Sequence, residues 1–229
     1  MISVCIATYN GETYLREQID SILPQLGQDD EVIISDDGSK DATLAILQSY
    51  GDPRIKIFKN SKHGYVHNFE NALLQAKGDY IFLSDQDDVW YPNKVEVCLG
   101  ILKSHIAVNH NSILVDSERV SMGVDFFTIH KSCGGYWKTL WRNSYSGCCM
   151  AFRRELLDYA LPFPQKVASH DIWLGLLAEK HGHPVFHAEP LLYYRRHGKN
   201  ASSTAEKSRL SFLQQLKYRF YMFVSSLSR

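Results

Sequence analysis

Hydrophobic and polar residues follow a regular pattern in the first hundred residues, which predicts strands and helices in alternation. Between short apolar runs, apolar residues recur at helical spacing, as they do from Leu15 to Leu26. Strands that alternate with helices form βαβ units and imply a parallel sheet with helices on its faces. We therefore expect an α/β fold with a mostly parallel central sheet. The apolar runs, each typical of a strand buried on both faces, are residues 2–7, 31–35, 54–58 and 79–84.

Two further helices are expected in this half of the chain. One should begin at Asp41, and the other should cover residues 66–76, with Gly78 placed to end it. The pattern after residue 100 is less regular, and residues 117–146 indicate no particular element. In this second half we expect strands at 109–117, 148–152, 184–188 and 191–196, a short helix at 153–160, a helix beginning at Asp171, and a helical tail at 207–229.

Polar residues follow each of the first four predicted strands. Ligands bind at the carboxyl ends of the strands in sheets of this kind, and those ends meet at one rim. The polar segments should therefore build one site together. They are residues 8–12, 36–39, 60–64 and 84–88.

The fourth segment, SDQDDVWYP, crowds three carboxylates into four positions. Asp85 and Asp87 lie on the same side of an extended chain, which suits a hard divalent cation such as Mg²⁺ or Mn²⁺. Such an ion would share its ligands with substrate phosphates, so the segment predicts a site for a diphosphate. The alternative is a solvated acidic loop, with one Asp capping the helix near Pro92.

The second segment, DDGS, is typical of an Asx turn followed by glycine. Asp37 could instead accept the ring N–H of a pyrimidine, and the two roles could fall to different residues of the pair. The sequence DQDDV also satisfies D-x-D-x-[VT], the nucleophile motif of haloacid-dehalogenase-type phosphatases. That motif ends the first strand of the phosphatases, whereas here it ends the fourth. A sugar nucleotidyltransferase would need a glycine-rich loop with arginine after its first strand, which TYNGE is not.

Composition further limits the classes of protein to which this chain could belong. The 229 residues contain 25 Lys plus Arg and 25 Asp plus Glu, a balance that argues against a general nucleic-acid binder. The five cysteines form no CxxC pair, so neither a disulfide framework nor a structural zinc site is indicated. With no basic leader and no apolar run long enough for a bilayer, we expect a cytoplasmic protein.

Three stretches resemble the family 2 glycosyltransferases: VCIATYNGETYLREQIDSIL, EVIISDDGSKDAT and GDYIFLSDQDDVWYPNK, in this order and spacing. Later segments, SGCCMAFRREL, HDIWL and LLYYRRHGKN, resemble the bacterial rhamnosyltransferase-like branch. The resemblance implies a GT-A fold, a nucleotide-sugar donor, a divalent cation, and inversion at the anomeric carbon by a single displacement. Processive members carry a QxxRW motif and membrane spans, which are absent here, so the addition of one sugar is favoured.

The resemblance also assigns roles to individual residues. Asp171 corresponds to the general base, and Asp87 and His197 lie where the family contacts the metal or the diphosphate. Lys62, on the rim after the third strand, is predicted to join the donor site. The predicted donor-nucleotide residues are Thr8, Tyr9, Glu12, Asp37, Lys62 and Asp85.

The physical chemistry agrees with these roles but leaves alternatives. An acceptor hydroxyl needs a positioned carboxylate to activate it. Asp171 could instead only cap the helix that follows, a role for which Ser169 competes. A non-catalytic nucleotide-sugar-binding module would lack the base altogether. The sugar and acceptor side is predicted to include Asp88, Trp90, Gly147, Cys148 and His170, although Trp90 and Cys148 could simply pack in the core.

The donor is expected to be dTDP-rhamnose or a UDP-hexose, and the acceptor a glycan or lipid-linked oligosaccharide of bacterial surface polysaccharide synthesis. Residues 1–100 form the expected donor half and 101–206 the acceptor half of one domain. In the tail, an apolar stripe flanked by basic residues predicts contact with the inner face of the membrane. The alternatives are packing on the domain or a homodimer contact. The stripe comprises Leu210, Leu213, Leu216, Phe220, Phe223, Val224 and Leu227.

Overall fold

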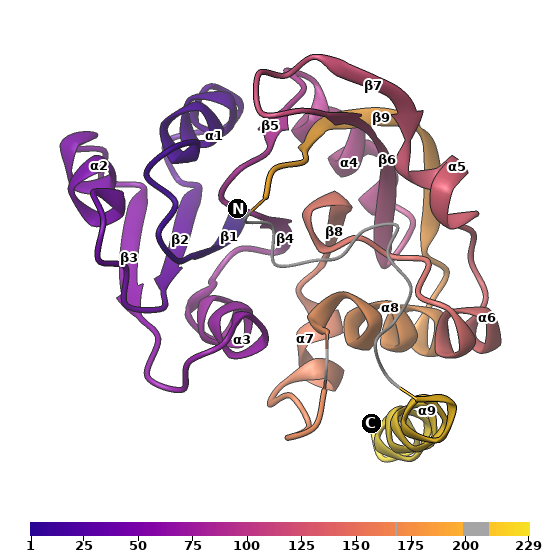
Figure 1. Ribbon diagram of the computed structural model, residues 1–229. Helices are drawn as coiled ribbons and strands as arrows, with labels where there is room; N and C mark the ends of the chain where they lie inside the picture. Colours follow the sequence, from indigo (N-terminus) through magenta and orange to yellow (C-terminus); the bar gives the residue numbers. More distant parts are fainter. Residues whose placement is uncertain (168, 199–210) are drawn as a thin grey trace.

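The computed structural model describes residues 1–167, 169–198 and 211–229. In this part of the chain, nine strands form one mixed sheet in the order β3-β2-β1-β4-β8-β6-β9-β5, with β7 paired to β6 (Figure 1). The strands are β1 (Ile2–Thr8), β2 (Glu31–Asp36), β3 (Ile55–Lys59), β4 (Tyr80–Ser84), β5 (Val89–Trp90), β6 (Ala107–Val115), β7 (Ser121–Asp125), β8 (Met150–Arg153) and β9 (Val185–Arg195).

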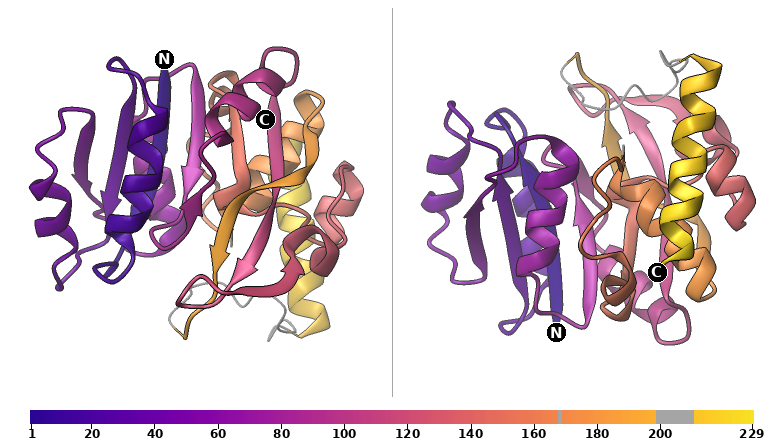
Figure 2. Two further views of the ribbon diagram at one scale, coloured as in Figure 1. Left: turned by 90° about the horizontal axis from the view of Figure 1, so that it is seen from above. Right: turned by 90° about the horizontal axis from the view of Figure 1, so that it is seen from below.

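Helices cover both faces of this sheet, as expected for an α/β fold (Figures 1 and 2). Two short 3₁₀ turns, η1 (Leu23–Gln25) and η2 (Gly147–Cys149), complete the regular structure of the described residues. The helices are α1 (Leu15–Ile22), α2 (Thr43–Ser49), α3 (Tyr65–Gln75), α4 (Lys94–Leu102), α5 (Phe126–His130), α6 (Tyr136–Trp141), α7 (Glu155–Ala160), α8 (His170–His181) and α9 (Phe212–Leu227).

The N-terminal half is built as the sequence predicts. Strands β3, β2, β1 and β4 are parallel neighbours, and the register pairs Thr8 with Asp36 and Ile6 with Ser84. The carboxyl ends of β1, β2 and β4 therefore lie at one rim. This arrangement confirms that polar segments far apart in the sequence follow strands that end side by side.

Alternation along the strands divides the core into two layers. Val4 and Ile6 of β1 belong to the cluster that includes Leu15 and Ile19 of α1, whereas Cys5 points into the opposite layer. That second layer also contains Phe69 of α3 and the apolar side of α8. Continuous apolar runs are needed because each of these strands is covered by helices on both sides.

The C-terminal half differs from the expectation in several places. Strand β8 is antiparallel to both β4 and β6, and it begins at Met150, because Cys148 and Cys149 lie in η2. The two strands expected at 184–188 and 191–196 are one strand, β9, whose pairing with β6 shifts register near Pro190. Proline interrupts the strand pattern in the sequence, but a bulge accommodates it in the sheet.

The unassigned region and the tail are also defined in the structure. Residues 117–146 contain β7, α5 and α6, which are each only five or six residues long. Helix α9 lies against α6 and α8 on the underside of the molecule (Figures 1 and 2). Leu210 and the boundary predicted at residue 206 lie outside the described residues. Among the helices that are described, none combines the length and hydrophobicity needed to cross a bilayer.

Gly78 predicts a measurable packing constraint between α3 and β1. A Cβ atom at this position would lie 2.6 Å from the backbone nitrogen of Ser3. We therefore expect Gly78→Ala to lower the free energy of unfolding by roughly 1–3 kcal/mol, because the backbone of β1 must shift. Gly100→Ala is the matched control, since nothing lies within 4 Å of its Cβ position in α4.

The control should raise the free energy of unfolding by about 0.5–1 kcal/mol, as alanine does in a helix interior. Urea denaturation of both variants measures the two effects. If Gly78→Ala is as stable as the wild type, the close approach of the two backbones is wrong.

Candidate active site

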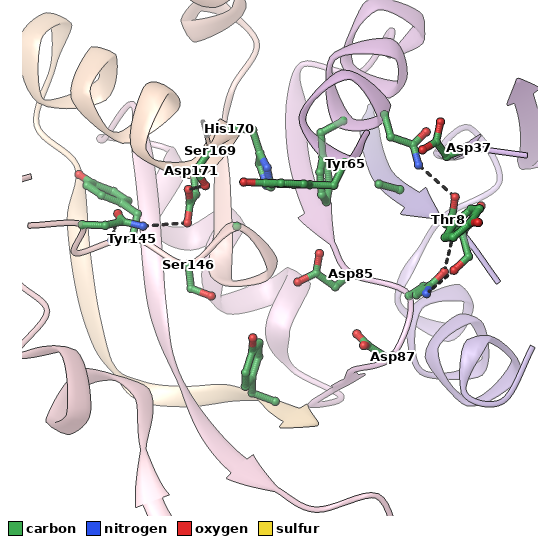
Figure 3. A pocket seen from close by; sticks show the side chains of 18 of the residues that line it. Thr8, Asp37, Tyr65, Asp85, Asp87, Tyr145, Ser146, Ser169, His170 and Asp171 are labelled. Carbon is green, nitrogen blue, oxygen red and sulfur yellow. Dashed lines mark hydrogen bonds between the residues drawn. The ribbon is translucent and has the colours of Figure 1, made fainter. Parts of the chain in front are cut away.

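A cavity of about 450 Å³ opens at the carboxyl ends of β1 and β4 and reaches across to the start of α8 (Figure 3). Thr8 and Asp37 line it at one end, and Asp171 and His170 at the other. Asp85 and Asp87 lie between the two ends. The structure thus brings together eight residues of the predicted site, which are Thr8, Tyr9, Asp37, Asp85, Asp87, Gly147, His170 and Asp171.

The two aspartates that follow β2 have different roles. Asp36 is buried and accepts hydrogen bonds from the backbone nitrogens of Gly38, at 3.0 Å, and Ser39, at 2.8 Å, which confirms the Asx turn. Asp37 lines the cavity instead. Its Oδ1 accepts a hydrogen bond from Asn60 Nδ2 at 2.8 Å, and its Oδ2 accepts one from the backbone nitrogen of Gly64 at 2.8 Å. Nδ1 of His63 also lies 3.1 Å from Oδ1. A carboxylate oxygen can accept two hydrogen bonds, so Oδ2 keeps capacity for a ligand.

Gln86, the middle residue of the acidic motif, connects β1 to β4. Its side-chain amide accepts a hydrogen bond from the backbone nitrogen of Tyr9 at 2.8 Å and donates one to the carbonyl of the same residue at 3.1 Å. The Tyr9 side chain is 53% exposed at the cavity edge. This double contact holds the loop after β1 against the acidic segment. The sequence did not single out Gln86, because this residue occupies the middle position of D-x-D, where the motif specifies no residue type.

Two predicted donor residues lie outside the cavity lining. Glu12 is exposed, and its carboxylate accepts a hydrogen bond from the backbone nitrogen of Ala42 at 2.8 Å, at the start of α2. The Lys62 ammonium is 3.6 Å from the carboxylate of Glu70 on α3. Among the described residues, these partners of the two side chains, Ala42 and Glu70, do not line the cavity.

The acidic segment holds its three carboxylates in different surroundings. Asp87 lines the cavity, and its Oδ2 is 2.8 Å from Nε2 of His197, so the two residues for which a metal role was predicted lie side by side. Asp88 is buried, and its Oδ1 accepts a hydrogen bond from the backbone nitrogen of Arg195 at 2.9 Å. Its Oδ2 is buried and has no hydrogen-bond partner among the described residues.

This chemistry fits a divalent cation. Ligand-type atoms of Asp85, Asp88 and Cys148 lie within 4.8 Å of one another, and Asp87 flanks them. Mg²⁺ and Mn²⁺ prefer oxygen ligands, and the partnerless oxygen of Asp88 is of the required kind. Burial raises the pKa of the Cys148 thiol well above its usual value, so this group is not a ligand of choice for a hard ion.

Crowding also affects the titration of the acids. Burial, followed by the charges of Asp87 and Asp171, raises the pKa of Asp85 to about 7. Burial and the charges of Asp87 and Asp85 raise the pKa of Asp88 well above its usual range. Acids whose charged forms are this unfavourable are typical of functional sites that a cation or a ligand completes.

Asp171 lies opposite the acidic segment, in the first turn of α8. The helix begins at His170 with Ser169 as the N-cap residue, so Asp171 is not the cap. Asp171 Oδ2 accepts a hydrogen bond from Asn143 Nδ2 at 3.0 Å, and Oδ1 accepts one from the backbone nitrogen of Ile172 at 2.7 Å and one from the Ser169 hydroxyl. A carboxylate has about four lone-pair sites, so one remains for a substrate hydroxyl.

His170 forms part of the cavity wall next to Asp171. Its ring stacks on Phe69, with centroids 3.8 Å apart, and is 6% exposed. In the part of the chain that the structure describes, neither ring nitrogen has a hydrogen-bond partner. Burial lowers the pKa of His170 to about 4, so the ring is neutral near pH 7. A side chain at Gly147 would collide with this imidazole, and glycine is therefore required there.

Trp90 and Cys148, the other predicted acceptor-side residues, are in the core. Trp90 is 3% exposed, and the ammonium of Lys94 lies 3.9 Å from the centroid of its ring. Cys148 is fully buried, and its carbonyl accepts a hydrogen bond from Lys94 Nζ at 2.8 Å. Because Trp90 is buried and absent from the cavity lining, its indole offers no open face on which a sugar could stack.

Several cavity residues came from regions that the sequence did not assign. Asn143 orients Asp171, and its Oδ1 accepts a hydrogen bond from the backbone nitrogen of Tyr145 at 2.9 Å. The Tyr145 hydroxyl in turn donates to Glu179 of α8 at 2.9 Å. The contacts to α8 join residues 28 and 34 positions apart, so no local sequence pattern predicts them. Other lining residues that the sequence analysis missed are Tyr65, Asn68, Phe69, Phe126, His130, Ser146, Ser169 and Tyr194.

Comparison with known proteins identifies the family. Residues 3–160 match the model of a family described as glycosyl transferase family 2. The chain belongs to this family. The match covers more than half of the chain and confirms the resemblance seen in the sequence motifs.

Relatives of this glycosyltransferase include enzymes with named activities. It is 28% identical to the dTDP-rhamnosyl transferase RfbG of Shigella flexneri, over 93% of this chain and 81% of that protein. It is also 28% identical to the Escherichia coli UDP-Glc:alpha-D-GlcNAc-diphosphoundecaprenol beta-1,3-glucosyltransferase WfgD, over 78% of this chain and 70% of that protein. An uncharacterized glycosyltransferase of Rickettsia typhi is 40% identical over 44% of this chain. The chain spans about a third or less of this relative and several similar ones.

Solved structures show the same fold at low sequence identity. The glycosyltransferase superposes on S. aureus TarS 1-349 in complex with UDP-GlcNAc with a TM-score of 0.73 and 20% identity, over 97% of this chain and 66% of that chain. Glucosyl-3-phosphoglycerate synthase from Mycobacterium tuberculosis, in complex with Mn²⁺, UDP and glucosyl-3-phosphoglycerate, gives a TM-score of 0.60 at 21% identity, over 100% of this chain and 79% of that chain. The expected GT-A fold is confirmed.

The raised pKa of Asp85 predicts that the acidic segment destabilises the metal-free protein more at high pH than at low pH. With a folded-state pKa of about 7 and an unfolded value of about 4, the folded protein retains a proton that the unfolded chain releases between these pH values. Stability of the metal-free protein is therefore lost as the pH rises through this window. We expect Asp85→Asn to increase the free energy of unfolding in EDTA by about 2 kcal/mol at pH 8, and by about a third as much at pH 5.

Thermal unfolding at the two pH values measures this difference, which corresponds to a rise in Tm of roughly 5 °C at pH 8. Asp158→Asn on the exposed side of α7 is the matched control and should change neither value. An equal gain for Asp85→Asn at both pH values would contradict the assignment of the raised pKa.

Proposed function

We propose that the protein transfers one sugar from a pyrimidine nucleotide-sugar to a hydroxyl group of a glycan, with inversion at the anomeric carbon. The observation that supports this most directly is the composition of the cavity. Asp37 lies at one end, Asp85 and Asp87 lie in the middle, and Asp171 lies at the far end (Figure 3). A nucleotide, a diphosphate and an acceptor hydroxyl require these groups in this order.

The donor nucleotide binds at the end formed by β1 and β2. In our proposal, Asp37 accepts the ring N–H of uracil or thymine, and Thr8 and Tyr9 border the ribose. Both dTDP-rhamnose and a UDP-hexose fit this description. RfbG is named a dTDP-rhamnosyl transferase and WfgD uses UDP-Glc, which supports a pyrimidine donor for this relative as well. Glu12 and Lys62 enter the donor site only if the loops that carry them move toward the cavity.

A divalent cation, Mn²⁺ or Mg²⁺, would be held by Asp85 and Asp87, with the partnerless oxygen of Asp88 beneath them. When bound, it would offset the negative charge that gathers on the leaving diphosphate. His197 touches Asp87 and adds a donor on the same side. The Mn²⁺ in the crystal structure of glucosyl-3-phosphoglycerate synthase supports the choice of ion.

Asp171 acts as the general base in this proposal. The acceptor oxygen attacks the anomeric carbon from the face opposite the diphosphate, and the bond between that carbon and the phosphate oxygen breaks. The proton of the hydroxyl passes to Asp171, so no covalent intermediate with the enzyme is needed. Asn143 and Ser169 fix the carboxylate. Neutral His170 offers a hydrogen-bonding nitrogen to a sugar hydroxyl beside Gly147.

The acceptor in our proposal is a lipid-linked oligosaccharide of bacterial surface polysaccharide synthesis, used at the cytoplasmic face of the membrane. The name of WfgD includes a diphosphoundecaprenol acceptor, which supports this class. Residues 1–100 would bind the donor and residues 101–206 the acceptor, with 207–229 as an appended helix. This division accounts for the placement of Asp37 and Asp171 at opposite ends of the cavity.

The alternatives receive less support. In a haloacid-dehalogenase-type phosphatase the acidic motif ends the first strand, whereas here β1 ends at Thr8 and the motif follows β4. A non-catalytic binding module would have no use for a carboxylate held by three donors at the acceptor end. The next two experiments distinguish that module from an enzyme.

Donor binding is expected to depend on a divalent cation and on Asp87. Calorimetric titration of UDP and dTDP should show at least 10-fold weaker binding in EDTA than in Mn²⁺, because the diphosphate would meet uncompensated carboxylates. Asp87→Asn should lose most of the response to Mn²⁺, and the control Asp158→Asn should keep it. Equal affinities with and without Mn²⁺ would remove the metal role from Asp87. Tighter binding of GDP than of UDP and dTDP would contradict the role of Asp37.

Asp171→Asn is expected to lower the rate of sugar transfer by about 10²–10⁴-fold. The affinity for UDP or dTDP should stay within about threefold of the wild type, because the base acts on the acceptor and not on the bound donor. Asp158→Asn on the exposed side of α7 is the matched control, and it should leave transfer and nucleotide binding unchanged.

Transfer is measured with a mixture of candidate nucleotide-sugars and a lipid-linked glycan acceptor, and nucleotide binding is measured separately by calorimetry. If Asp171→Asn unfolds or loses nucleotide binding, Asp171 has a structural role. If Asp171→Asn keeps full turnover, another carboxylate is the base. Nucleotide binding without transfer in the wild type for every donor and acceptor would favour the binding module.

A further inference from the structure

Helix α9 turns much of its apolar stripe away from the protein. The most buried side chains of α9 are Met222, which is 1% exposed, and Ser226, which is fully buried. The Tyr136 and Ser226 hydroxyls are 2.5 Å apart, and Lys180 Nζ donates to the Ser226 carbonyl at 2.6 Å. The exposed fractions on the other side are 69% for Leu213, 68% for Phe220, 47% for Val224 and 59% for Leu227. Packing on the domain therefore does not explain the stripe.

Helix α6 extends this exposed surface with two tryptophans. Trp137 is 68% and Trp141 is 60% exposed. The Trp137 ring lies beside Phe223 of α9, with centroids 5.6 Å apart, and the Arg219 guanidinium lies 4.3 Å from the Trp141 ring. Figure 2 shows the two helices next to each other on the underside of the molecule. We call this surface the α6–α9 face, and it comprises Trp137, Trp141, Leu213, Phe220, Val224 and Leu227.

The two segments that carry the α6–α9 face have side-chain charge of one sign. Residues 127–146 and 207–229 contain no Asp or Glu, although the whole chain has as many acidic as basic residues. Three basic residues lie in the first segment and five in the second. Those in the described part of the chain are Lys131, Lys138, Arg142, Lys217, Arg219 and Arg229.

From these observations we propose that the α6–α9 face binds the surface of an anionic lipid bilayer, with α9 lying in the plane of the interface. An apolar helix face bordered by basic residues and tryptophan is suited to this environment, where indole rings and cations meet headgroups. A second copy of the chain is a poorer occupant, because self-pairing would bring the two basic borders together. At 16 residues, α9 is too short to span a bilayer.

Contact with the bilayer would also fix the position of the cavity relative to the membrane surface. Helix α6 lies in the chain between His130 and Asn143, which both line the cavity. Lipid bound at α6 would therefore adjoin the acceptor end of the cavity, near Asp171. This consequence rests on the proposed function, whereas lipid binding by the α6–α9 face does not.

The four tryptophans of the chain allow a direct test in the unmodified protein. Trp90 and Trp173 are at most 3% exposed, whereas both exposed tryptophans lie on the α6–α9 face. Vesicles of phosphatidylcholine with 30% phosphatidylglycerol should shift the emission to shorter wavelength, and brominated lipid should quench it. Pure phosphatidylcholine vesicles should bind at least 10-fold more weakly, and 0.5 M salt should weaken the binding to the anionic vesicles.

Variants locate the contact by co-sedimentation with the same vesicles. The combined variant Trp137→Ser, Trp141→Ser, Phe220→Ser and Leu227→Ser should bind at least 10-fold more weakly than the wild type. The control Val120→Ser with Met122→Ser removes exposed apolar side chains from the distant β7 region and should bind as the wild type does. Circular dichroism checks that each variant is folded, and the quenching experiment does not depend on the variants.

Three results would overturn the proposal. They are an absence of wild-type binding to anionic vesicles, equal binding by the combined variant when folded, or a dimer that the combined variant dissolves while vesicles have no effect on the wild type. No nucleotide-sugar is present in these experiments, so a failure here leaves the proposed sugar transfer untouched. Failure of transfer likewise leaves lipid binding untouched.

Discussion

Mutual repulsion of carboxylates at the end of β4 is the constraint on which the rest of the site depends. Asp85, Asp87 and Asp88 follow one buried strand, and Asp171 faces them across the cavity. Burial and like charge raise the pKa of Asp85 and Asp88, so holding them ionised costs stability in the absence of a cation. The fold must hold these groups together by other contacts, and those contacts account for much of the local architecture.

Arg195 supplies several of these contacts at the end of β9. Its backbone nitrogen donates to Asp88, and its Nε donates to the carbonyl of Asp87 at 2.9 Å. Nη1 donates to the Ser117 carbonyl at 2.5 Å, and Nη2 forms an ion pair with Glu17 of α1. A single buried guanidinium thus ties the acidic segment to three other parts of the chain. Its planar group of five donors makes this possible, and lysine would not replace it.

Lys94 acts on the other side of the same segment. It is fully buried, donates to the carbonyl of Cys148 and lies over the ring of Trp90. Burial lowers the pKa of Lys94, while the nearby thiols and Asp88 oppose that effect. The Lys94 side chain therefore lies near Asp88 but outside the lining of the cavity. The indole of Trp90 packs against Lys94, which accounts for its burial.

The sequence predicted the β1–β2 end of the cavity, which is the proposed donor end, better than the α8 end, which is the proposed acceptor end. Strands β1, β2 and β4 are buried on both faces, so their apolar runs are visible, and parallel pairing brings their ends together. The acceptor end depends on α5 and α6, which are too short to show a helical period. Its key contacts, such as Asn143 to Asp171, join residues far apart in the chain. The sequence also predicted two strands where the structure has the single strand β9, because a residue pattern does not reveal the bulge that accommodates Pro190.

Helix α8 connects the candidate base to the α6–α9 face. Asp171 lies in its first turn, and Glu179 lies near its end. Glu179 Oε1 accepts hydrogen bonds from the backbone nitrogen of Gly135 at 2.8 Å and from the Tyr145 hydroxyl at 2.9 Å, so one carboxylate fixes both ends of the segment that carries α6.

A second link, from Tyr145 through Asn143, returns to Asp171. A side chain at Gly175 of α8 would collide with the Tyr145 ring, so this contact also requires close packing. The candidate base and the segment that carries the tryptophans of α6 are therefore both joined to α8. A surface that held α6 in place would also orient the end of the cavity that contains Asp171, because the hydrogen bonds of Gly135, Tyr145 and Asn143 link the two.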